Sequence, residues 1–307
     1  MTDSSPALAP RPSAIPAHQI HPPTIVCGLD GSPASIDLAR IATTLGHHVG
    51  AQIELVHVLD AGRSGRSSDS DPRMEAQAML DGICHSSQAA ANAQLVEFGD
   101  PARRIAAIAE RQSAGLIIVG TRGNAPVTDA LLGSVSSRLA GDAPCPVLIV
   151  PPAVQPHVRP ERWPQRTIIC GYDGSDSAWD AALSASGLAA RLRTRLCLVS
   201  IGTVINWRVA EAAARLRHWL DEHSGPASFV PEIDWELRSG DPAWKLERVA
   251  RAITAPLLAI GSRGLGPRND PLLGSVARRV LLAARRPILV CPATASSAAA
   301  DNADERR

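Results

Sequence analysis

The residues of this sequence best suited to chemistry are glycines and serines that follow apolar, strand-like runs. Gly120 and Gly123 are separated by two residues, and Gly133 and Ser134 follow after nine more. Glycine lets a backbone approach a phosphate closely, and the start of a helix offers unpaired N–H groups and a positive dipole end. Because Gly-Ser opens the last predicted helix, Ser134 is placed where phosphate groups would lie. The spacing therefore predicts a phosphate-binding loop.

The same spacing occurs a second time, 141 positions later in the chain. Its members are Gly261, Gly264, Gly274 and Ser275. The repeat extends further, because Thr24–Ser32 matches Thr167–Ser175 and Leu131–Val135 matches Leu272–Val276 almost residue for residue. A nearly constant offset, 143 for the first segment and 141 for the others, is the signature of a duplicated unit. The sequence therefore predicts two copies of one domain.

Each copy alternates short, β-branched apolar runs with helix-like stretches, which is the pattern of parallel βαβ units in an α/β fold. The predicted strands cover 24–29, 53–59, 94–98, 115–120 and 146–150, then 167–172, 195–201, 233–238, 256–261 and 287–291. The predicted helices cover 33–48, 72–91, 101–113 and 134–141, then 176–191, 205–223, 242–254 and 275–285. Several of these helices begin with Ser, Asp or Pro in the first turn.

The predicted domains are 23–152 and 166–292. Between them, residues 153–165 form the predicted linker. The four prolines of residues 151–160 resist helix formation, so we expect the linker to be stiff. Residues 1–22 and 293–307 have no hydrophobic periodicity, and we expect both ends to be disordered.

An aspartate closes the first predicted strand of each copy, Asp30 in one and Asp173 in the other. Ligands of parallel α/β sheets gather at the carboxyl ends of the strands, where these residues lie. Asp-Gly-Ser is also good turn and helix-cap chemistry, so a purely structural role is the alternative. The neighbouring glycine loops favour a ligand, although tight turns without a ligand would also use these glycines.

This loop spacing, together with the opening strand and the closing Pro-Val-Leu-Ile-Val-Pro run, resembles the ATP-binding class of universal stress proteins over almost all of residues 24–292. The resemblance implies a Rossmann-type fold in which each domain is a five-stranded parallel sheet with helices on both faces. It also implies pairing of two domains through their last strands, either between the tandem copies or in a homodimer.

The same resemblance implies ATP as ligand, with or without Mg²⁺, and assigns roles to residues. Asp30 and Asp173 would hold the ribose hydroxyls or organise the nucleotide loop, and the backbone of Val58 or Ile201 would meet adenine. The implied residues of the first site are Gly28, Asp30, Val58, Gly120, Arg122, Gly123, Gly133, Ser134 and Val135. Those of the second site are Gly171, Asp173, Ile201, Gly261, Arg263, Gly264, Gly274, Ser275 and Val276. Arg122 and Arg263 either neutralise phosphate charge or are solvated surface arginines.

The motifs of other nucleotide-binding sites and of histidine metal sites do not fit this sequence. Lys245 is the only lysine and no Gly-x4-Gly-Lys-Ser/Thr motif occurs, so the chain is not a Walker-type NTPase. The Gly261–Gly266 segment follows the fourth strand rather than the first, which rules out a dinucleotide fingerprint. The histidines have no metal-ligand spacing with cysteine or carboxylate, so we expect no metal site made of them.

Net charge and hydropathy argue against nucleic acids and membranes as partners. A formal net charge of +1 gives no general attraction to nucleic acid or to acidic membranes, and no apolar run is long enough to span a bilayer. The six cysteines are scattered, mostly within apolar strands, which favours reduced thiols and a cytoplasmic location. The family resemblance implies a nucleotide-dependent regulator of stress response or growth arrest that binds ATP and is not an enzyme. Slow ATP hydrolysis, or a nucleotide-independent module for an unknown protein partner, is the alternative.

Overall fold

The computed structural model describes residues 24–60, 71–121, 132–152, 160–164, 166–202, 206–224, 228–265 and 273–293. The N-terminal copy contains β1 (Thr24–Leu29), α1 (Ala34–Val49), β2 (Gln52–Leu59), α2 (Pro72–Ser87), β3 (Ala93–Phe98), α3 (Pro101–Arg111), β4 (Leu116–Gly120), α4 (Ser134–Asp142) and β5 (Val147–Val150). The C-terminal copy contains β6 (Ile168–Gly171), α5 (Asp176–Arg191), β7 (Leu196–Ile201), α6 (Asn206–His223), β8 (Ile233–Arg238), α7 (Pro242–Ala252), β9 (Leu258–Gly261), α8 (Ser275–Ala283) and β10 (Ile288–Cys291). These bounds confirm the predicted alternation of strands and helices.

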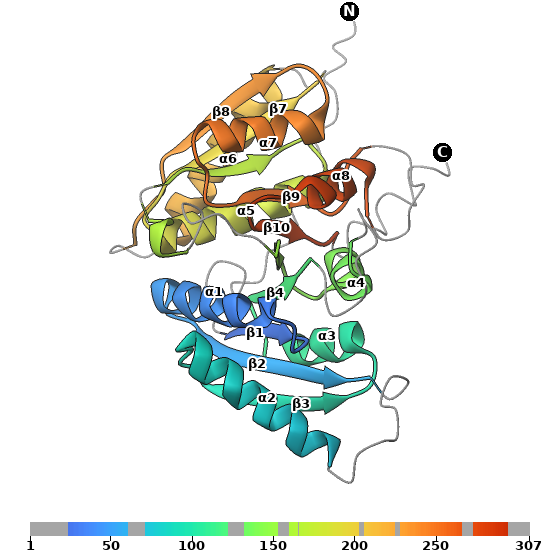
Figure 1. The fold of residues 1–307 in the computed structure, drawn as a ribbon. Helices are drawn as coiled ribbons and strands as arrows, with labels where there is room; N and C mark the ends of the chain where they lie inside the picture. The colour runs from blue at the N-terminus through green and yellow to red at the C-terminus, as the bar shows by residue number, and fades with distance from the viewer. Residues whose placement is uncertain are drawn as a thin grey trace, which may run out of the picture.

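All ten strands form one continuous sheet in the order β3-β2-β1-β4-β5-β10-β9-β6-β7-β8. Neighbouring strands within each copy are parallel, whereas β5 and β10 pair antiparallel, with Leu148 opposite Leu289. The two copies therefore join through their last strands, and Figure 1 shows them on either side of that seam. Because the seam is antiparallel, the strand carboxyl ends of the two copies lie at opposite edges of the sheet.

Helices cover both faces of the sheet. One buried cluster gathers residues of α1, α2, α5 and α6, and the second gathers residues of α3, α4, α7 and α8, on the other face. The strands supply fully buried Ile, Val and Leu to both clusters, as expected of a parallel sheet that is covered on both sides. Figure 1 shows α1 of the N-terminal copy facing α5 of the C-terminal copy across the seam, and Arg191 on α5 donates a hydrogen bond to the Val49 carbonyl.

Side-chain caps explain where several helices begin. Asp71, Asp100 and Asp241 accept hydrogen bonds from backbone N–H groups of α2, α3 and α7, and proline follows each aspartate. Such a cap supplies a partner for one of the free N–H groups of the first turn. The helix predicted to run to 91 ends instead at Ser87, because Gln88 adopts a left-handed conformation with φ of 54° and terminates it.

The segment between the copies docks at its C-terminal end. Residues 160–162 form a short 3-10 helix, and Trp163 directly after it is fully buried in the cluster that contains α1 and α5. Residues 153–159 and 165 of the predicted linker, residues 1–22 and nearly all of the predicted tail lie outside the described residues. Within the described part of the chain, no helix is both long and apolar enough to cross a membrane.

Candidate functional site

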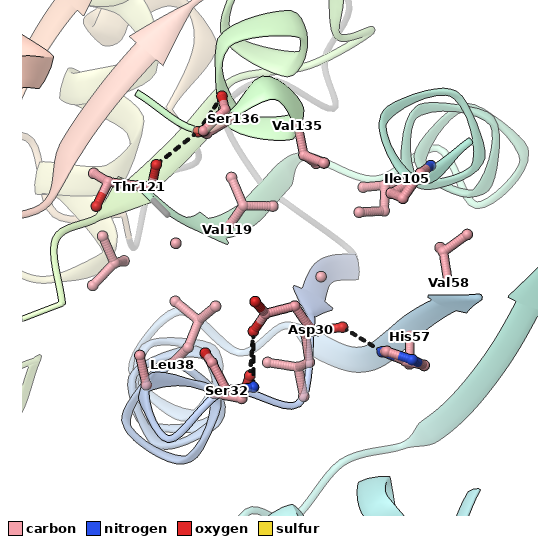
Figure 2. A pocket seen from close by; sticks show the side chains of 18 of the residues that line it. Asp30, Ser32, Leu38, His57, Val58, Ile105, Val119, Thr121, Val135 and Ser136 are labelled. Atoms are coloured by element: carbon pink, nitrogen blue, oxygen red, sulfur yellow. Dashed lines mark hydrogen bonds between the residues drawn. The ribbon is translucent and has the colours of Figure 1, made fainter. Parts of the chain in front are cut away.

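A cavity of about 810 Å³ opens at the carboxyl ends of the N-terminal strands. Its size falls within the range that accommodates a drug-sized ligand. Figure 2 shows Asp30 and Ser32 on one side of this pocket and Thr121, Val135 and Ser136 facing them from the other. We call this space the N-terminal cavity.

Asp30, which follows β1, is fixed at the entrance to α1. Its Oδ1 atom accepts a hydrogen bond from the backbone N–H of Ser32 at 3.1 Å and another from the Ser35 hydroxyl at 3.0 Å. Asp30 therefore has the structural role at a turn that the sequence offered as the alternative to ligand binding. The same residue also lines the N-terminal cavity.

Hydrogen bonds join the residue that follows β4 to the start of α4. The N–H of Gly133 donates to the Thr121 carbonyl at 2.8 Å, and the Ser136 hydroxyl donates to the same oxygen at 3.1 Å. Gly133 caps α4 without a side-chain hydrogen bond, and Gly120, Gly133, Ser134 and Val135 all line the cavity. The first turn of α4 thus directs its backbone donors and positive dipole end toward this space.

The opposite end of the cavity is apolar. Val58, Ile105 and Val119 line it, and Figure 2 shows Val58 and Ile105 side by side. Gly28 also borders this end, where a methyl group added to it would lie 2.6 Å from Cδ1 of Ile105. Next to Val58, Nδ1 of His57 donates to the Leu29 carbonyl at 2.8 Å, which ties the end of β2 to β1.

Asp100 and Arg138 also line the cavity, and sequence reasoning assigned them no role. Oδ1 of Asp100 accepts the N–H of Arg103, and Oδ2 pairs with Arg138 at 2.6 Å. The hydrogen bonds from Arg138 and Arg103 lower the pKa of the Asp100 carboxyl. The sequence did carry a signal for this pair, because Asp100 and Arg138 recur in the second copy as Asp241 and Arg279. Those two residues also form a salt bridge.

The segment that joins β5 to β6 contributes a further wall that the sequence did not predict. Pro151, Pro152 and Glu161 line the N-terminal cavity, together with residues of α1. The ordered segment that ends at Trp163 therefore connects this cavity to the junction between the copies. Arg122 and Gly123 of the predicted site lie outside the described residues.

In the C-terminal copy, the residues that follow β9 lie close to the start of α8 and to Asp173. The N–H of Gly274 donates to the Ser262 carbonyl at 2.8 Å, which reproduces the contact between Gly133 and Thr121. A methyl group on Gly274 would lie 3.3 Å from Cα of Arg263, and one on Gly264 would lie 2.3 Å from Oδ2 of Asp173. Ser275 begins α8 as Ser134 begins α4.

Packing accounts for the other predicted residues of this copy. A methyl group on Gly171 would lie 2.9 Å from Cδ1 of Leu246, and one on Gly261 would lie 2.3 Å from the Ser177 hydroxyl. Ile201 and Val276 pack partly buried against the second hydrophobic cluster. Close packing of α5 and α7 on the strand ends is therefore sufficient reason for glycine at both positions.

The cysteines and potential metal ligands point to no further chemistry. All six cysteines are free, and burial raises the pKa of Cys145 and Cys291 to about 12, which keeps these thiols protonated. Among the described residues, no group of three or more His, Cys, Asp or Glu side chains is arranged to hold a metal ion.

Comparison with known proteins agrees with this geometry. The model of the universal stress protein family matches residues 23–151 and again residues 165–292. Two universal stress proteins of Mycobacterium tuberculosis strain H37Rv are each 32% identical to the chain, over 57% and 58% of its length. The matches span only 58% and 62% of the length of those relatives.

Solved structures show the same fold. A universal stress protein from Archaeoglobus fulgidus superposes with a TM-score of 0.66 at 21% identity, covering 88% of this chain and 98% of the other. A protein of unknown function from Pseudomonas aeruginosa PAO1 superposes with a TM-score of 0.58 at 16% identity, covering 94% and 99%. Two matches to one family model, each over a complete five-stranded half of the sheet, establish that the chain belongs to the universal stress protein family and carries two tandem copies of its domain.

Proposed function

We propose that the N-terminal cavity binds an adenine nucleotide, ATP together with Mg²⁺, and that the protein regulates a stress response through this binding rather than through turnover. One observation carries the proposal. Asp30, the uncapped start of α4 and an apolar end at Val58 converge on one cavity of about 810 Å³ at the carboxyl ends of parallel strands. A nucleotide has the matching parts, which are an anionic chain, a hydroxylated sugar and a flat apolar base.

The cavity assigns each part of the ligand a place. The phosphates would meet the N–H groups at the start of α4, because helix N-termini favour anions. The Asp30 carboxylate would accept hydrogen bonds from ribose hydroxyls, and Val58, Ile105 and Val119 would enclose the base. Mg²⁺ would enter with the phosphates, since it retains several waters and binds largely through phosphate oxygens.

Binding without turnover is supported by the state of Asp100, a cavity carboxylate that would otherwise be a candidate base. Both of its oxygens accept hydrogen bonds, and its pKa is lowered by Arg138 and Arg103. An effective general base needs a pKa close to the operating pH and a free lone pair directed at the reacting proton. Asp100 instead caps α3 and ties it to α4, which is a structural role.

Family membership supports a regulatory role, and nucleotide occupancy would supply a physical means for it. The cavity is bordered by α1, by α4 and by the segment between β5 and β6, so a bound nucleotide would contact all three. A ligand present at 100 times its dissociation constant stabilises the form that binds it by about 2.7 kcal/mol. That stabilisation would favour one arrangement of the chain for recognition by a protein partner.

The test is calorimetric titration of Mg-ATP into wild type and Ser134→Glu. Ser134 is exposed at the first position of α4, where a carboxylate suits the helix dipole but repels phosphate. We expect the variant to keep its thermal stability and to lose at least tenfold in affinity. Ser275→Glu, at the same position of α8, is the control for the effect of the charge on folding. Wild-type protein that gives neither heat nor a thermal shift with ATP, ADP or AMP would contradict the proposal.

A further inference from the structure

Two helices begin at the N-terminal cavity, and they differ in what occupies their first turn. Asp100 caps α3, because its Oδ1 atom accepts the N–H of Arg103. Gly133 caps α4 without a side-chain hydrogen bond, and both cap residues line the cavity. The positive end of α3 is therefore already paired with a carboxylate, whereas the positive end of α4 is open to an anion.

Arg138 lies on the side of α4 that faces this open helix start. It follows Ser134 by four residues, which places it about one turn, or about 6 Å along the axis, from the beginning of the helix. Residues four apart share one face of a helix, and their side chains lean toward its N-terminus. Ser134 and Arg138 both line the N-terminal cavity. The guanidinium therefore borders the space in front of the first turn of α4.

The Asp100 carboxylate is the partner of this guanidinium. Nη1 of Arg138 lies 2.6 Å from Oδ2 of Asp100. Hydrogen bonds from Arg138 and from the Arg103 N–H lower the pKa of the carboxyl, so Asp100 is ionised at neutral pH. The two side chains are 37% and 42% exposed, and ion pairs with such access to water contribute little to stability. The pair can therefore open at small cost.

A phosphate chain offers Arg138 a better partner than Asp100 does. A guanidinium can donate two parallel hydrogen bonds to phosphate oxygens. Only Oδ2 of Asp100 is directed at Arg138, because Oδ1 accepts the Arg103 N–H. A triphosphate also carries several negative charges, and its oxygens would lie before the first turn of α4, within the same cavity. Both geometry and charge therefore favour the nucleotide over the carboxylate.

We propose that Arg138 exchanges Asp100 for the phosphate chain when a nucleotide enters the N-terminal cavity, and that this exchange makes the site prefer adenine nucleotides with more phosphates. The inference rests on the proposed function for the class of ligand. Arg138 is then a specificity-determining residue, and Asp100 is its competing partner in the empty site. The exchange separates α4 from Asp100, while Oδ1 of Asp100 continues to cap α3.

A purely structural role for the pair leads to a different expectation. If the pair only tied α3 to α4, removing either member would disturb the cavity in the same direction. Under the proposed exchange the two substitutions act in opposite directions, because Arg138→Gln removes a partner of the phosphates and Asp100→Asn removes a competitor. Asparagine is as good a helix N-cap as aspartate, so α3 keeps its start in Asp100→Asn.

The experiment is a calorimetric titration of Mg-ATP and of AMP into variants of the full chain. The binding step that Ser134→Glu weakens identifies the N-terminal cavity. At this step we expect Arg138→Gln to bind Mg-ATP about tenfold more weakly than wild type, and Asp100→Asn about threefold more tightly. The ratio of the AMP to the ATP dissociation constant should fall in Arg138→Gln and rise in Asp100→Asn. Arg138→Lys keeps the charge but not the planar fork, so it should recover only part of the affinity.

Arg103→Gln is the matched control. It removes the same charge close to Asp100, but Arg103 is exposed and is not among the described residues that line the cavity. Its backbone N–H, which donates to Asp100, is retained in the variant. We therefore expect Arg103→Gln to bind Mg-ATP as tightly as wild type.

Unchanged Mg-ATP affinity in Arg138→Gln and Asp100→Asn, or a change of the same sign in both, would overturn the exchange and leave nucleotide binding intact. A loss in Arg103→Gln as large as that in Arg138→Gln would also overturn it, because a general effect of charge would then replace the contact. Wild-type protein that binds neither Mg-ATP nor AMP would contradict the proposed function, and the exchange with it.

Discussion

Replacing Trp163 tests whether the segment between the copies is part of the core. The side chain is fully buried, and it lies in the cluster that contains α1 of one copy and α5 of the other. A buried tryptophan removes about 150–250 Å² from water, worth about 4–6 kcal/mol at roughly 25 cal/mol per Å². Cavity-forming Trp→Ala substitutions cost about 3–5 kcal/mol, so we expect Trp163→Ala to lower the free energy of unfolding by about 4 kcal/mol.

The assay is urea unfolding followed by circular dichroism, with Trp244→Ala as control. Trp244 is 55% exposed on α7, where the cations of Lys245 and Arg248 lie over its ring, so its removal should cost less than about 1 kcal/mol. Equal shifts of the unfolding midpoint in the two variants would refute the placement of Trp163. A loss confined to a first, partial transition would locate its effect in one copy.

Two further predictions concern charged groups of the C-terminal copy. Arg286 is 3% exposed, donates to the Ala250 and Ala255 carbonyls and pairs with Glu247. Arg286→Ala should therefore lower the free energy of unfolding in urea by about 3–5 kcal/mol. A decrease of less than about 1 kcal/mol would contradict this prediction. Burial, and secondarily the charge of Asp176, raises the pKa of Asp180 from 3.8 to about 6. Between these values the folded state binds more protons than the unfolded state, so stability falls as pH rises. The melting temperature of Asp180→Asn should therefore exceed that of wild type at pH 7 and equal it near pH 4. Equal melting temperatures at pH 7 would refute the raised pKa of Asp180.

Local signals in the sequence were sufficient for the fold. Buried parallel strands are short and β-branched, and helix starts carry Asp or Ser caps, so β8 and α5 were predicted to the residue. Helix ends were predicted less well, because they depend on backbone conformations such as the left-handed one of Gln88. The residue type of Gln88 does not indicate that conformation. The pairing of the two last strands followed from the family resemblance rather than from any local pattern.

The candidate site was predictable where it depends on spacing and not where it depends on contacts. The glycine spacing predicts that Gly133 lies near the end of β4, and the Gly133 N–H donates to the Thr121 carbonyl there. The Asp100–Arg138 pair and the contribution of Glu161 join residues far apart in sequence, so no local pattern indicates them.

Native mass spectrometry of the full chain with added Mg-ATP tests whether the N-terminal cavity binds a nucleotide. We expect an adduct of the mass of ATP on each chain, strongly reduced in Ser134→Glu and retained in Ser275→Glu. A chain that carries no nucleotide adduct, or an adduct indifferent to Ser134→Glu, would contradict nucleotide binding in this cavity.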